Sequence, residues 1–97
     1  MSGYVGAQPE QQSEDEILMA FAREAPGDDP RSAGARALVL RWQEHIAKYH
    51  GGCDEFKLRR LGELYGADDR FLESLDSYGP GTARFMSDAI AAYLESR

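Results

Sequence analysis

Apolar residues recur at intervals of three and four positions along most of the chain, a spacing that places them on one face of an α-helix. No stretch alternates polar and apolar residues for long enough to form a β-strand. The sequence therefore predicts an all-α fold. The longest apolar face consists of Ala35, Leu38, Val39, Trp42, Ile46 and Tyr49.

Glycine, proline and capping residues divide the chain into about five expected helices joined by short loops. Ser13 and Glu16 match a capping box, and Gly51-Gly52 supplies the left-handed conformation that ends many helices. Acidic pairs and runs fall at the expected helix starts, where they complement the helix dipole and are expected to be solvated. The expected starts are Ser13, Asp29-Pro30, Asp54, Asp68 or Asp69, and Pro80.

The length of 97 residues allows one domain, and 42% hydrophobic residues suffice for its core. Residues 1–12 carry Gly, Pro and Gln without an apolar period, so we expect a flexible tail before a domain over residues 13–97.

The net charge of −6 argues against direct binding to nucleic acid or to anionic membrane surfaces, because both require basic patches. One cysteine excludes an internal disulfide and fits a reducing compartment. No long apolar run marks a transmembrane segment or a signal peptide. We therefore expect a cytoplasmic protein that uses neither a membrane nor DNA as a direct partner.

Residues 42–53 concentrate the only tryptophan, both histidines, a tyrosine and the only cysteine. His45 and His50 are five positions apart, which turns them to different sides of a helix, whereas zinc ligands on one helix are usually three or four apart. A structural zinc site would also need a second ligand cluster, and the sequence has none. We expect no metal and no cofactor.

Cys53 lies at or just before an expected helix start, where free amides and the helix dipole lower a thiol pKa. The alternative, which we favour, is a small hydrophobic residue in a turn. No nucleophile signature surrounds Cys53, so we expect no enzymatic activity. The many Tyr and Trp side chains are partly core, and the rest suit the walls of a pocket.

Two segments, RRLGELYGADDRF at 59–71 and SYGPGTARFMSDAIAAY at 77–93, resemble consecutive motifs of the TipAS-type antibiotic-recognition domain, with a slightly altered order around Gly62. Residues 43–46 resemble the helix that precedes them in that family. The matched positions are Leu61, Gly62, Leu64, Tyr65, Ala67, Asp68, Arg70 and Phe71 in the first motif, and Gly79, Pro80, Gly81, Ala83, Phe85, Asp88, Ala89 and Ile90 in the second.

The resemblance implies a globin-like fold around a central cleft that binds bulky, often peptidic antibiotics. Such domains usually form the C-terminal effector half of MerR-family transcription activators, and in some members a cysteine captures thiopeptides covalently. The sequence lacks the DNA-binding winged helix and coiled coil. We therefore expect an effector domain or a drug-sequestering protein, with homodimerisation through a missing N-terminal region as one expected assembly.

The resemblance also suggests which residues bind the ligand. The alternatives left open are a helical protein–protein interaction module with an aromatic groove, and a cysteine-dependent enzyme. The hypothetical ligand-binding residues are Trp42, His45, Tyr49, His50 and Cys53 on one wall, Phe56, Arg60, Tyr65 and Phe71 on the facing wall, and Tyr78 and Phe85 as its closure.

Overall fold

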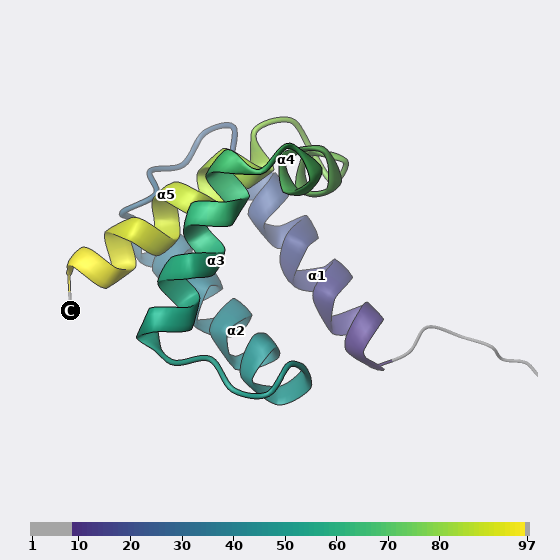
Figure 1. Cartoon of the computed structure of the whole chain (residues 1–97). Helices are drawn as coiled ribbons and strands as arrows, with labels where there is room; N and C mark the ends of the chain where they lie inside the picture. The colour runs from purple at the N-terminus through teal and green to yellow at the C-terminus, as the bar shows by residue number, and fades with distance from the viewer. Residues whose placement is uncertain (1–8, 97) are drawn as a thin grey trace, which may run out of the picture.

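The computed structural model describes residues 9–96, and this part of the chain contains five α-helices and no strand (Figure 1). The predicted all-α fold with about five helices is therefore confirmed. Residues 1–8 of the expected tail lie outside the described residues. The helices are α1 (Pro9–Glu24), α2 (Ala33–Tyr49), α3 (Glu55–Ala67), α4 (Asp69–Asp76) and α5 (Thr82–Glu95).

Helix α1 begins at Pro9, four residues before the expected start. Proline is well suited to a first helical position, because the amide that it lacks would have no partner inside the helix. Ser13 is therefore inside the helix and does not cap it. Its hydroxyl instead lies 3.1 Å from Nδ1 of His45 on α2, so a tertiary contact replaces the expected capping box.

The start of α2 also differs from the expectation. Ser32 is the N-cap, and its hydroxyl accepts a hydrogen bond from the amide of Ala35 at 3.0 Å. Asp28 and Asp29 shape the preceding turn, because Asp28 accepts from the Ser32 hydroxyl and Asp29 accepts from the amide of Arg31, each at 2.8 Å. The aspartates thus act one turn earlier than predicted.

Two predicted caps are confirmed. Asp54 accepts from the amide of Lys57 at the start of α3, and Asp68 accepts from the amide of Arg70 at the start of α4, each at 2.9 Å. These carboxylates satisfy amides that have no partner inside their helices.

Helices α3 and α5 pack most extensively against each other. The two helices approach each other closely at Gly62, where a Cβ atom would lie 2.9 Å from Cγ2 of Ile90. A residue with a side chain at this position would push the two helices apart, which explains the glycine within the helix. The largest fully buried side chains of the core are Phe21, Val39, Leu58, Met86 and Ile90.

Helix α1 stands opposite α3, with α2 passing behind α3 and α4 across one end (Figure 1). Phe21 on α1 is fully buried and meets the ring of Phe85 on α5 edge to face, with centroids 6.3 Å apart. Apolar packing thus fixes the C-terminal half of α1 to the body of the domain. None of the described helices is long and apolar enough to span a membrane.

Candidate ligand-binding site

A pocket of about 330 Å³ lies among helices α1, α2, α3 and α4, and we call it the α1–α4 pocket. Most of its lining side chains are aromatic or aliphatic. Apart from its two tyrosines, its ionisable groups are Glu14 on α1, His50 at the C-cap of α2 and Lys57 on α3. The lining residues are Glu14, Leu18, Trp42, Ile46, His50, Lys57, Leu61, Tyr65, Phe71, Ser74, Leu75 and Tyr78.

Trp42 and Tyr65 form a buried pair in the wall of the pocket. The indole Nε1 donates a hydrogen bond to the Tyr65 hydroxyl at 3.1 Å, and Phe71 meets the Tyr65 ring edge to face at 5.3 Å between centroids. Burial raises the pKa of Tyr65 to about 12, so the phenol is neutral at physiological pH. The wall therefore offers apolar ring surface with its polar atoms already paired.

Charged groups are held at the edge of the pocket. Lys57 Nζ donates hydrogen bonds to the carbonyl oxygens of His50 at 2.8 Å and Gly52 at 2.9 Å, which ties it to the turn after α2. The Tyr78 hydroxyl donates to Asp15 at 2.6 Å, and this bond raises the pKa of Tyr78 to about 12. The expected solvated role of residues 14–16 is therefore wrong for Asp15, whose carboxylate joins α1 to the α4–α5 turn.

The two histidines lie close together, although the spacing argument predicted that they face apart. His50 is the C-cap of α2, so its backbone leaves the helical path. The two imidazole centroids are 6.0 Å apart, with Glu14 beside them at 3.8 Å from His45 Nε2. His45 itself is buried and stacks on Trp42 at 5.2 Å between centroids, behind the pocket wall.

The model of one protein family, described as the TipAS antibiotic-recognition domain, matches residues 7–93. The chain belongs to this family.

Relatives of this TipAS domain are transcription activators. The HTH-type transcriptional activator mta of Bacillus subtilis is 39% identical over 66 residues, which cover 68% of this chain and 26% of the activator. The HTH-type transcriptional activator TipA of Streptomyces coelicolor is 34% identical over 83 residues, which cover 84% of this chain and 33% of that protein. The chain thus spans about a third of these relatives or less. No solved structure matches it significantly.

Five of the residues predicted for the site of this TipAS domain line the α1–α4 pocket. The other six lie elsewhere: His45 is behind the wall, Tyr49 packs on His45, and Phe85 is in the core. Phe56 is 70% exposed and Arg60 is also exposed, while Cys53 is half-buried against the core. The five lining residues are Trp42, His50, Tyr65, Phe71 and Tyr78.

Sequence reasoning assigned several lining residues of this TipAS domain to the core or to solvent. Helical spacing could have identified them, because residues one turn apart share a helix face. Ile46 lies one turn after Trp42, and Leu61 lies one turn before Tyr65. Ser74 and Leu75 lie one turn after Phe71. The overlooked residues are Glu14, Leu18, Ile46, Lys57, Leu61, Ser74 and Leu75.

Of the two interpretations of Cys53, the less favoured one, a thiol with a lowered pKa, is wrong. Burial raises the pKa of this thiol, the negative charge of Asp54 raises it further, and Lys57 only partly opposes them. One of the amides at the start of α3, that of Lys57, is also engaged, because it donates to the Asp54 carboxylate. Cys53 in this TipAS domain is therefore a weakly acidic thiol.

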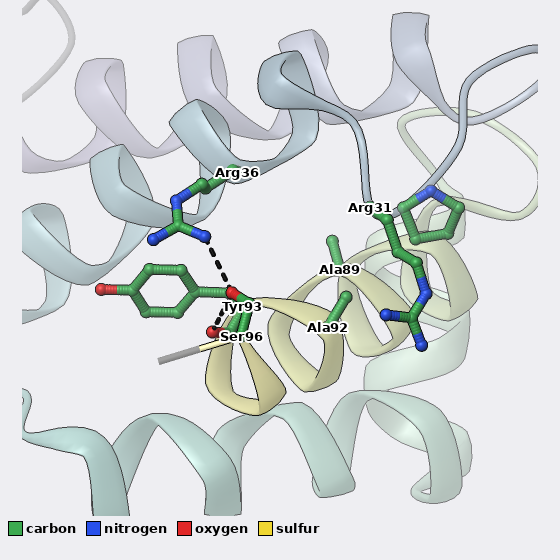
Figure 2. Close-up of a pocket in the computed structure, with 7 residues that line it drawn as sticks. Arg31, Arg36, Ala89, Ala92, Tyr93 and Ser96 are labelled. Carbon is green, nitrogen blue, oxygen red and sulfur yellow. Dashed lines mark hydrogen bonds between the residues drawn. The ribbon is translucent and has the colours of Figure 1, made fainter.

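A second cavity of about 210 Å³ lies at the far end of the TipAS domain, between the start of α2 and the end of α5. Figure 2 shows the Arg36 guanidinium facing the Tyr93 ring and donating a hydrogen bond to the Ser96 hydroxyl at 2.8 Å. The cavity is smaller and contains none of the predicted ligand-binding residues, so the α1–α4 pocket is the better candidate site. It is lined by Pro30, Arg31, Arg36, Ala89, Ala92, Tyr93 and Ser96.

Proposed function

We propose that the α1–α4 pocket binds bulky hydrophobic or peptidic antibiotics of the thiopeptide kind. In this proposal the chain acts in the cytoplasm, as the effector-sensing domain of a MerR-type transcription regulator or as a drug-sequestering protein. The observation that carries it is a pocket lined with aromatic and aliphatic side chains in a member of an antibiotic-recognition family.

The volume of about 330 Å³ is at the lower end of the range of small-molecule sites, which is about 300–1,000 Å³. A bulky antibiotic therefore inserts one ring system or side group, while the rest remains outside. Trp42, Tyr65 and Phe71 offer ring surface for this group, and burying apolar area there supplies most of the affinity.

The charge of the chain favours some ligands over others. With a net charge of −6 and Glu14 at the pocket, neutral or cationic antibiotics are preferred over anionic ones. The same charge supports the view that this chain does not contact DNA directly.

Binding in this proposal is reversible. Cys53 does not line the pocket and its pKa is raised, so little thiolate is available to attack a dehydroalanine. Both histidines are engaged with other side chains, His45 with Ser13 and His50 with Glu10, which also supports a binding protein over a cysteine-dependent enzyme.

The test is titration with a thiopeptide and, in parallel, with an unrelated hydrophobic antibiotic. The emission of Trp42, the only tryptophan, reports on the pocket wall, and intact mass reports covalent addition. We expect quenching without added mass. Phe71→Ala should weaken binding about tenfold or more, whereas Phe56→Ala, the same change at an exposed ring, should leave it unchanged.

Equal weakening by both substitutions, or by neither, would place the ligand elsewhere. Added mass that disappears in Cys53→Ala would replace reversible binding by covalent capture. No response to any antibiotic would favour the helical protein–protein interaction module.

A further inference from the structure

We propose that Glu14, His45 and His50 form a binding site for a divalent transition-metal ion of the Zn²⁺ class. This site lies at the edge of the α1–α4 pocket and joins α1 to the C-terminal end of α2. It does not depend on the proposed antibiotic binding.

The three side chains are gathered by the fold. One ligand atom from each lies within 4.8 Å of the other two, although Glu14 is more than 30 positions from the histidines in the sequence. Imidazole nitrogens and carboxylate oxygens are ordinary ligands for Zn²⁺, with bond lengths of about 2.0–2.2 Å. Glu14 and His50 are partly exposed, with side-chain exposures of 33% and 44%, so small rotations can bring their atoms around one ion.

His45 supplies the observation that points to a ligand. Its side chain is only 1% exposed, and its Nε2 atom has no hydrogen-bond partner within the described part of the chain. A buried polar atom without a partner is costly, by about 1–3 kcal/mol. Nε2 faces Glu14 at 3.8 Å, which is too long for a hydrogen bond but leaves room for an ion between them.

The other nitrogen of His45 is oriented as in known metal sites. Nδ1 lies 3.1 Å from the Ser13 hydroxyl. In the tautomer with its proton on Nδ1, that N–H donates to the hydroxyl oxygen, and the lone pair of Nε2 is left for an ion next to Glu14. Metal-binding histidines almost always donate their second ring N–H to a carboxylate, a backbone carbonyl or a water, which fixes the ring. Here the Ser13 hydroxyl is in the place of that partner. The Trp42 ring stacks on one face of the His45 imidazole and also limits its rotation.

The local charges suit a dication. Glu10 Oε2 lies 3.0 Å from His50 Nε2, so a second carboxylate adjoins the cluster. Glu10 and Glu14 together offset two positive charges. The nearest lysine, Lys57, is directed to the carbonyl oxygens of the turn after α2. An ion bound here would fasten the N-terminal half of α1 to the end of α2, where the contacts of His45 with Ser13 and of His50 with Glu10 already join them.

Zn²⁺ and Co²⁺ are the probes, on protein without a histidine tag at pH 7.5. We expect one equivalent of Zn²⁺ by calorimetry, a visible Co²⁺ spectrum, and a higher thermal midpoint with Zn²⁺. His50→Gln and Glu14→Gln should each weaken binding at least tenfold and abolish the Zn²⁺-dependent rise in midpoint. Both side chains are partly exposed, so circular dichroism should show folded variants.

Glu16→Gln removes the same charge from the exposed side of α1, and Cys53→Ser removes the thiol, so both should bind as wild type. Absence of Zn²⁺ heat and of a Co²⁺ spectrum up to millimolar ion would overturn the proposal and leave ordinary ion pairs at these histidines. Binding that persists in His50→Gln and Glu14→Gln would also overturn it, because the ion would then lie elsewhere.

Discussion

The indole nitrogen of Trp42 donates a hydrogen bond to the hydroxyl of Tyr65 at 3.1 Å, across the buried contact between α2 and α3. Both side chains are less than 5% exposed, and both line the α1–α4 pocket. The bond therefore sets the separation of two pocket walls with a polar pair that water does not reach.

Tyr65→Phe should lower the free energy of unfolding by about 1–3 kcal/mol, because it leaves the buried indole N–H without an acceptor. Denaturant unfolding followed by circular dichroism measures the loss, and Trp42 emission should change in the folded state. Tyr49→Phe, at a half-buried ring outside the pocket, should cost less than about 0.5 kcal/mol. Equal stability of the two variants would show that the bond contributes nothing.

Gly62→Ala should destabilise the domain by about 1–3 kcal/mol, even though alanine favours a helix, because its Cβ would meet Ile90 at 2.9 Å. Ile90→Leu removes the branch at that contact and should recover part of the loss in the double variant. Gly34→Ala, in α2, meets no atom closer than 3.6 Å and should stabilise by about 0.5–1 kcal/mol. Thermal unfolding of the wild type and of these variants distinguishes the effect of helix packing from that of helix propensity. A stabilised Gly62→Ala would contradict the close approach.

Tyr78→Phe should cost about 1 kcal/mol, since it removes the 2.6 Å hydrogen bond to Asp15 that fastens α1. The folded-state pKa of about 12 exceeds the ordinary value of 10.0, so the contribution of this phenol is complete below pH 10 and is lost as the pH rises toward 12. Unfolding measured between pH 8 and 12 should therefore show a shallower alkaline decline in the variant. Parallel curves for variant and wild type would contradict this role.

Cys53 should react slowly with iodoacetamide at pH 7, because burial holds its pKa above the ordinary thiol value. The rate measured by intact mass should rise through a midpoint above the ordinary thiol pKa in the folded protein. In denaturant the midpoint should return to the ordinary thiol value. A folded-state midpoint below the denatured-state midpoint would instead support the lowered pKa, the less favoured of the two interpretations of the sequence.

Local signals in the sequence predicted most of the fold. The aspartates at 54 and 68 cap α3 and α4 as expected, because a cap is decided by residues within one turn of it. The start of α1 was wrong, since Ser13 bonds to His45, 32 positions away, and no local pattern reports such a contact.

The site was harder to predict than the fold. Pocket and core residues share the same helical faces, so Trp42 and Phe85 look alike in sequence, although one lines the pocket and the other packs under Phe21. The proximity of the histidines depends on one backbone change at the C-cap of α2. Spacing rules assume a continuous helix and miss such a change.

Within these 97 residues, the close contact, or seam, at Gly62 and Ile90 and the α1–α4 pocket use different residues. The seam demands one particular shape, whereas positions such as Leu18 and Ser74 face the pocket from helices α1 and α4, outside it. A substitution at an exposed lining position such as Ser74 can therefore change the shape of the α1–α4 pocket while the α3–α5 contact stays as it is.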